Sequence, residues 1–327
     1  MTDLFDPPGS ATGEVAKDFK RNGRMQPMIL PPGASKPLPY SRCTTFVDAL
    51  DDKSGLMKWK ARMATVGLAG RPDLQLAISS TPTDDKRGLD RIVEQALEAA
   101  QASAAATTGT ALHQLTERID LGLGIDGLIL PDEHRASLDA YRNATTGIEW
   151  LGVEQRRVCH QHKVAGTADR VAIVDGKLTI FDIKTGSIDY ALGKIAMQLA
   201  MYAHSQPYDV DTDITGEDLA PVDLERAVII HLPAGQGVCT LHWVDIAAGW
   251  EAVGLAAQVR AWRSRSRKLS TPIHSSLTGS PDLVDQVEAF TDLDKLRSWY
   301  LQMEAAGRGS AALLAACTAK ADELKAA

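Results

Sequence analysis

β-Branched residues are concentrated in the middle of the chain, where polar and apolar positions tend to alternate. This spacing is typical of half-buried β-strands. It predicts three neighbouring strands followed by two more, over residues 153–159, 164–174, 178–184, 226–231 and 238–244. The first three are separated by short polar segments, so we expect them to form an antiparallel meander.

Apolar residues recur every three or four positions on both sides of these strands, which predicts amphipathic helices. Residues 44–68 predict two helices joined by a turn at Ser54-Gly55, and residues 89–107 predict a further helix. Gly109 is expected to interrupt that helix, so that Thr110 caps a separate one over 111–120. Helices are also expected at 192–204 and 247–263 and in the Ala-rich last ~40 residues.

The order of these elements predicts an α/β domain with a mixed central sheet flanked by helices, and not a doubly wound sheet. Seven of the 15 prolines fall in the first 39 residues, so residues 1–40 are interpreted as an extended arm, with ordered structure beginning near Tyr40. Residues 41–269 are expected to form one domain, with a helical entry over 41–108 and a core over 109–269. Residues 270–327 are expected to form a helical tail after a polar stretch at 270–288.

Composition excludes several classes of protein. The net charge is −7, so a bulk electrostatic attraction to nucleic acid is absent and any such binding must come from local basic patches. No apolar run approaches ~18 residues, and the first residues lack the features of a signal peptide. The four cysteines are scattered without a CxxC. We therefore expect a cytoplasmic protein without membrane spans, disulfides or a cysteine-bound cluster.

The most informative segment is the expected hairpin over residues 164–186. Asp175-Gly176 is a favoured two-residue turn, and it sets a register in which Asp169 faces Asp182 across the two strands. Lys184 points to the same face. Two opposed carboxylates repel each other unless a divalent cation neutralises them, and a cation beside an ammonium group suits hydrolysis of a phosphate ester.

A hairpin with solvated surface charges is the alternative interpretation, and the hairpin alone does not separate the two. The neighbouring segments separate the two interpretations. They are GTALH at 109–113, GTAD at 166–169 with DIK at 182–184, and QLAMY at 198–202. In this order they resemble the RecB-type branch of the PD-(D/E)XK nucleases, which includes phage exonucleases and CRISPR-adaptation nucleases. The resemblance covers about residues 44–265 and implies a restriction-endonuclease-like core.

The resemblance also implies a role for each matching residue. Mg²⁺ or Mn²⁺ would be held by His113, Asp169, Asp182 and the backbone carbonyl of Ile183. Lys184 would be the catalytic lysine. Gln198 and Tyr202 would contact the DNA backbone or position Lys184.

Other polar residues are candidates on weaker grounds. Glu117 lies one helical turn after His113 and Glu154 lies on the preceding strand, so each could support the metal site. The basic residues Lys194, Arg263, Arg265 and Arg267 are candidates for contact with phosphates, although the three arginines equally suit a helix C-terminus. The segment CHQH at 159–162 could suggest zinc, but a strand would place Cys159 on the face opposite to the histidines.

The expected function is a metal-dependent DNA exonuclease acting on DNA ends or single strands in phage recombination or replication, within the host cytoplasm. A recombination protein would be its partner. Neither an iron–sulfur cluster nor a nucleotide is expected, because the cysteine spacing and a GxxxxGK[ST] segment are missing. The alternatives are a structure-specific endonuclease and a non-cleaving module that binds DNA or protein. Oligomeric state and cleavage polarity are left open.

Overall fold

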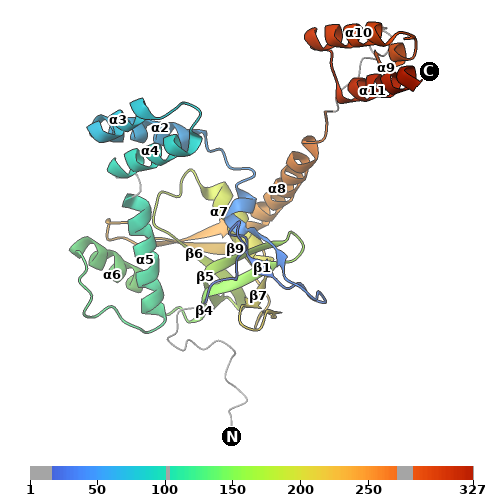
Figure 1. Cartoon of the computed structure of the whole chain (residues 1–327). Helices are drawn as coiled ribbons and strands as arrows, with labels where there is room; N and C mark the ends of the chain where they lie inside the picture. The colour runs from blue at the N-terminus through green and yellow to red at the C-terminus, as the bar shows by residue number, and fades with distance from the viewer. Residues whose placement is uncertain (1–16, 101–103, 271–282, 327) are drawn as a thin grey trace. The chain divides into compact units, whose positions relative to one another are not determined.

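The computed structural model describes residues 17–100, 104–270 and 283–326 (Figure 1). The chain divides into two compact units, Met1–Arg263 and Ser264–Ala327. The division thus falls before residue 264, whereas the sequence placed the domain boundary after residue 269. All residues of the expected metal site belong to the first unit.

A mixed sheet forms the centre of the first unit. Its middle is an antiparallel meander of β4 (Trp150–Cys159), β5 (Val164–Val174) and β6 (Lys177–Lys184). The Asp175-Gly176 turn joins β5 to β6, and both residues have the positive φ that such a turn requires. The predicted strands and their hairpin connection are therefore confirmed.

Further strands extend this sheet on both sides, so the described part of the sheet has the order β10-β9-β6-β5-β4-β7-β8. β9 (Arg226–His231) runs parallel to β6, and β10 (Thr240–Asp245) pairs with it antiparallel. β7 (Gln206–Asp209) and β8 (Ile214–Thr215) were not expected from the sequence. Short β3 (Ser41–Arg42) pairs with the start of β5. The sheet is mixed and not doubly wound, as predicted.

Helices cover the two faces of the sheet with separate hydrophobic clusters. On one face the strands pack against α1 (Cys43–Val47), α7 (Leu192–Ala203) and α8 (Ile246–Ser266). On the other face α6 (Asp132–Ala144) contributes Tyr141 to a cluster with β5, β6 and β9. α6 also packs against α5 (Ala104–Asp120). The helix α5 therefore lies where it can present polar side chains to the strands.

The helix α5 runs without a break through Gly109 and Thr110, so the expected helix boundary at Gly109 is wrong. The reason is a close contact with a segment that is distant in sequence. A Cβ atom at residue 109 would lie 2.5 Å from Oγ1 of Thr185, which follows β6. The glycine allows this close approach instead of ending the helix.

Between α1 and α5, the described residues form three helices, α2 (Ser54–Ala69), α3 (Pro72–Ser80) and α4 (Lys86–Ala99). Ser54 and Gly55 begin α2, so the turn predicted there is wrong in position. α4 ends at Ala99 and not at residue 107 as predicted, and α3 and α6 were missed. The three share a small cluster centred on Leu74, Ile92 and Ala96.

The N-terminal segment departs from the expected extended arm. Its described part forms an antiparallel pair of β1 (Met28–Ile29) and β2 (Leu38–Pro39). Phe19, Ile29 and Tyr40 are buried against β4, β5 and β7. Ordered structure therefore begins well before Tyr40, because a few apolar residues among the prolines pack against these strands. The expectation for residues 1–16 lies outside the described residues.

The second unit contains α9 (Leu283–Val287), α10 (Leu293–Ala305) and α11 (Ala311–Ala326). They share a cluster around Val287, Leu296, Leu313 and Cys317. The described residues 283–326 are thus mostly helical, as predicted for the last ~40 residues, although α9 lies inside the stretch predicted to be polar and rich in turns. Across the described residues, no helix has the length and apolar character needed to cross a membrane.

Candidate metal centre

The predicted hairpin register is confirmed for the pairs from Val174–Lys177 to Arg170–Phe181, but the pairing stops before Asp169 and Asp182. Ala168 and Val171 pack in the same cluster although they are three residues apart. Residues three apart point to opposite faces of a regular strand, so the alternation is interrupted at Asp169 and Arg170. The two aspartates are therefore not a regular cross-strand pair.

A different residue opposes Asp169. Glu154 of β4 lies between the pairs Val153–Arg170 and Gln155–Ala168, which places it across from Asp169. Glu154 has a φ of 52°, a left-handed conformation that is unfavourable for a residue with a side chain. This irregular backbone places the two carboxylates beside each other.

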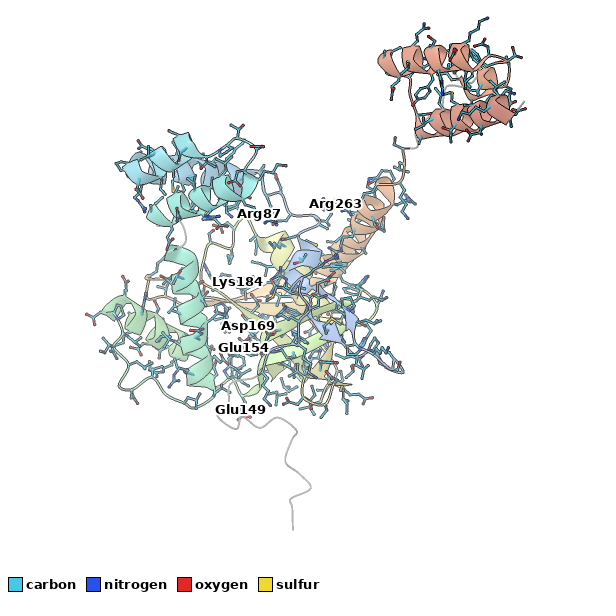
Figure 2. All side chains as sticks on the ribbon, viewed as in Figure 1. Arg87, Glu149, Glu154, Asp169, Lys184 and Arg263 are labelled. Carbon is cyan, nitrogen blue, oxygen red and sulfur yellow. The ribbon has the colours of Figure 1, made fainter. Side chains whose placement is uncertain are left out.

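A histidine from α5 completes the group. His113, Glu154 and Asp169 each offer one ligand atom, and these atoms all lie within 4.8 Å of one another. Nδ1 of His113 is 3.7 Å from Oδ2 of Asp169. Figure 2 shows Glu154 and Asp169 beside α5, with Lys184 close by. We call these three residues the HED cluster.

Asp182 and Lys184 form a second polar group next to this cluster. Nζ of Lys184 is 2.5 Å from Oδ2 of Asp182, and Nε2 of Gln198 donates a 3.0 Å hydrogen bond to Oδ1. The backbone N–H of Ile183, between them, donates to Oδ2 of Asp169 at 2.7 Å. The strand β6 thus links the cluster to the lysine.

Burial gives these groups unusual protonation behaviour. Burial raises the pKa of Glu154 to about 7, and the negative charge of Asp169 adds to this effect. Burial likewise raises the pKa of Asp182 to about 6, with Asp169 opposing the lowering effect of Lys184. Burial lowers the pKa of Lys184, but Asp182 and Asp169 outweigh it and the pKa is raised overall. The lysine therefore stays charged at neutral pH.

The donor set fits a hard divalent cation. Two carboxylates and an imidazole are ligands that Mn²⁺ accepts, and carboxylates suit Mg²⁺. The buried Oδ2 of Asp182 is already paired with the Lys184 ammonium group at 2.5 Å, so the crowding that a cation would relieve lies between Glu154 and Asp169. Crowded carboxylates are stabilised when a cation is present.

The structure brings most of the predicted site residues close together but groups them differently from the expectation. Glu154, expected only to support the site, belongs to the HED cluster, whereas Asp182 contacts Lys184 and Gln198. Tyr202 is buried, and its hydroxyl oxygen accepts a 3.4 Å hydrogen bond from Gln198. Glu117 raises the pKa of Glu154 through its charge and is not part of the cluster. The ligand role of the Ile183 carbonyl stays a prediction.

The basic residues predicted to contact phosphates either contact other parts of the protein or belong to the second unit. Lys194 forms ion pairs with Asp48 at 2.5 Å and Asp51 at 3.1 Å, so its charge is neutralised within the protein. Arg263 donates a hydrogen bond to the Ala49 carbonyl oxygen. Arg265 and Arg267 are exposed residues of the second unit. A phosphate contact by these residues stays a prediction.

The CHQH segment does not assemble a zinc site. Nδ1 of His160 bonds to the Tyr40 hydroxyl and Nε2 bonds to the Thr215 hydroxyl, both at 2.9 Å. His162 instead packs against Phe46 and Trp250. Among the residues that the structure describes, no group of three metal ligands includes this segment.

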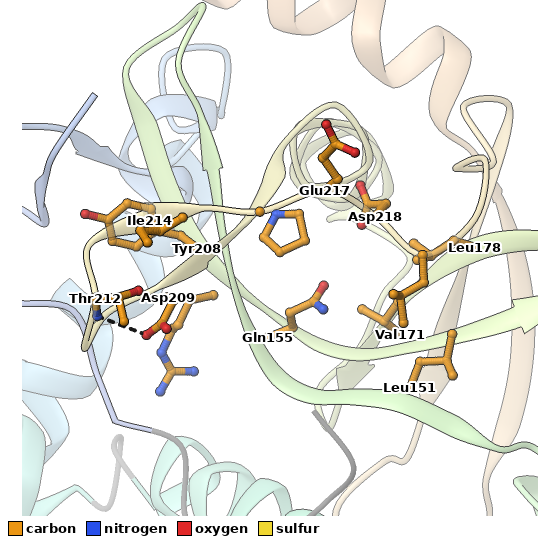
Figure 3. Close-up of a pocket in the computed structure, with 14 residues that line it drawn as sticks. Leu151, Gln155, Val171, Leu178, Tyr208, Asp209, Thr212, Ile214, Glu217 and Asp218 are labelled. Carbon is orange, nitrogen blue, oxygen red and sulfur yellow. Dashed lines mark hydrogen bonds between the residues drawn. The ribbon is translucent and has the colours of Figure 1, made fainter. Parts of the chain in front are cut away.

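A large cavity of about 660 Å³ lies elsewhere in the first unit, between β4, β5 and the β7–β8 region (Figure 3). Val171, Leu178 and Ile214 give it apolar walls, and Asp218 lines it as well. None of the residues of the HED cluster lines it, so the cavity is separate from the candidate metal centre.

Arg170, Asp120 and Tyr141 are buried polar residues that the sequence analysis did not single out. Arg170 lies in β5 directly before the apolar run Val171–Val174, and its side chain is fully buried. A charged residue inside a predicted core strand needs a buried partner of opposite charge, and this was the signal available in the sequence.

A scan against models of protein families found no match, and neither did a search of curated proteins.

Proposed function

We propose that this protein is a metal-dependent deoxyribonuclease with a restriction-endonuclease-like core, and that it degrades DNA from its ends in phage recombination or replication. The observation that carries the proposal is the convergence of the four sequence segments on one site. His113, Asp169, Asp182, Lys184 and Gln198 are far apart in sequence, yet contacts or electrostatic interactions connect them.

The HED cluster would hold the cation, with Asp182 as a further ligand if its side chain turns from Lys184. A divalent cation there would supply positive charge to a phosphate and lower the pKa of nearby water. Asp169 is held in place by the backbone of Ile183 at 2.7 Å. The chain therefore positions its ligands through backbone contacts as well as through side chains.

Lys184 supports the proposal by its charge and its location. The Lys184 side chain is 27% exposed, so its ammonium group can contact a bound phosphate while it stays paired with Asp182. A fixed positive charge there stabilises the negative charge that develops on a phosphate during hydrolysis. Gln198 orients Asp182, and Tyr202 lies next to Gln198.

The test compares Asp182→Ala and Lys184→Ala with the unmodified chain on end-labelled linear duplex and single-stranded DNA with Mg²⁺. Each variant is expected to lose activity by ~100-fold or more, since each removes a group that acts on the phosphate or its cation. Lys177→Ala is the matched control, because Lys177 lies at the other, exposed end of the same strand. It should cleave at the normal rate.

The proposal is overturned if both site variants keep normal activity, or if the unmodified chain binds no Mn²⁺ in calorimetry. Closed circular DNA tests the exonuclease assignment separately. An exonuclease leaves the circle intact, whereas cutting of the circle would assign an endonuclease with the same metal centre.

A further inference from the structure

Arg170 is fully buried, and its charged group spans the gap between the sheet and α5. Its Nε donates to Oδ2 of Asp120 at 2.5 Å, and its Nη1 donates to the backbone oxygen of Asp169 at 2.7 Å. A guanidinium group stays protonated at any ordinary pH. Arg170 therefore places a permanent positive charge directly behind the HED cluster.

The same guanidinium also reaches β4 and a second residue of α5. Its Nη1 is 3.5 Å from Oε1 of Glu154, and its Nη2 donates to the hydroxyl of Thr116 at 3.4 Å. Asp120 accepts a further hydrogen bond of 2.6 Å from Tyr141 of α6. One side chain thus connects the three elements that carry His113, Glu154 and Asp169.

We propose that Arg170 is a positioning residue that sets the affinity of the HED cluster for its cation. This inference rests on the proposed metal-dependent function. Arg170 cannot itself be a ligand, because a guanidinium has no free electron pair for a cation. It acts through Glu154, through the Asp169 backbone and through α5.

The physical reason is pre-organisation. Glu154 and Asp169 repel each other when no cation is bound, and Glu154 also holds an unfavourable backbone conformation. The charge of Arg170, 3.5 Å from Oε1 of Glu154, offsets this repulsion and attracts the carboxylate, as does Arg156 at 4.0 Å from Oε2. Without it the carboxylates can separate, and a cation must then bring them together again at the expense of its binding energy.

A purely structural role is the competing explanation, and the chain contains a matched control for it. Arg157 of β4 is also fully buried and forms an ion pair with Asp218 at 2.8 Å. Its other side-chain hydrogen bonds go to Gln155 and to the backbone oxygens of Tyr202 and Ser205. None of these partners of Arg157 in the described residues belongs to the HED cluster.

The experiment measures Mn²⁺ binding by calorimetry on the full-length chain without DNA, for the unmodified protein, Arg170→Met, Asp120→Asn and Arg157→Met. Removing a residue that holds metal ligands typically lowers affinity ~10–100-fold, and this is expected for Arg170→Met. Asp120→Asn should give a smaller loss in the same direction. Arg157→Met should bind Mn²⁺ as the unmodified chain does, although it also lowers the melting temperature.

The inference is overturned if Arg170→Met binds Mn²⁺ as tightly as the unmodified chain, or if Arg157→Met loses as much affinity as Arg170→Met. If Arg170→Met does not fold, Asp120→Asn decides the matter by the same comparison, and normal affinity in that variant overturns the inference. Failure of the unmodified chain to bind Mn²⁺ is a different result, because it overturns the proposed function itself.

Discussion

Single residues in this protein show how burial changes the chemistry of polar groups. The carboxylates of the candidate metal centre have raised pKa values because they are buried near like charges. The histidines that pack near Trp250 change in the opposite direction. Burial lowers the pKa of His162, and burial together with the charge of His162 lowers the pKa of His204. Both rings pack against Trp250, and that of His204 is stacked on it at 3.8 Å.

These histidines predict a loss of stability in mild acid. An unfolded histidine binds a proton below a pH of about 6.5, whereas the folded protein resists protonation. The stability that these histidines contribute is therefore complete above that pH. It is lost as the pH falls through their lowered pKa values in the folded protein. Because the raised pKa values of Glu154 and Asp182 act in the opposite direction in the same pH range, the prediction is a difference between two proteins. Between pH 7.5 and 5.5 we expect the melting temperature of the unmodified chain, measured by Trp fluorescence, to fall relative to that of His204→Phe. An identical change in both proteins would contradict this prediction.

Secondary-structure elements approach one another closely at the glycines of the motif segments. Gly166 of β5 faces α7 and α1, since an added Cβ would lie 2.8 Å from Cε1 of Tyr202 in α7 and 3.1 Å from Cβ of Cys43 in α1. Gly109 has the same role between α5 and Thr185. These glycines let the elements that carry the site residues pack within reach of one another.

The variant Gly166→Ala is therefore expected to destabilise the protein by about 1–3 kcal/mol, because the methyl group overpacks the contact between β5 and α7. Chemical denaturation measures this change. Gly193→Ala in α7 is the control, since a Cβ there meets no atom within 4 Å and alanine favours a helix. It should be neutral or slightly stabilising. Equal destabilisation by both variants would show that the close contact is not the cause.

The whole molecule consists of two units with separate hydrophobic clusters. The cluster of the second unit is formed by residues between Leu283 and Leu324. The described residues of the candidate metal centre lie in the first unit, between His113 and Tyr202. Each unit thus has apolar contacts of its own to stabilise it.

We accordingly predict that a chain ending after Ser270 keeps the melting temperature of the first unit and its affinity for Mn²⁺. Scanning calorimetry of the full-length chain should show a separate transition for the second unit, which the shortened chain lacks. Loss of cooperative unfolding in the shortened chain would show that the first unit depends on the second.

The sequence by itself determined the local features of this fold. Alternating β-branched residues located the strands of the meander, and Asp175-Gly176 set the register between β5 and β6. The strand and turn signals are readable because each depends on residues within one element or across one short turn. The order of the motif segments predicted that His113, Asp169, Asp182 and Lys184 lie near one another, and the structure places them so.

Only the tertiary structure decided which carboxylates meet. The register of β4 and β5 places Glu154 across from Asp169 at a residue of irregular backbone, and the pairing of β5 with β6 stops before Asp169 and Asp182. The continuity of α5 through Gly109 depends on the position of Thr185, which is distant in sequence. The partners of Arg170 likewise come from three separate elements. Such contacts depend on how elements pack, and local propensity carries no information about packing between distant segments.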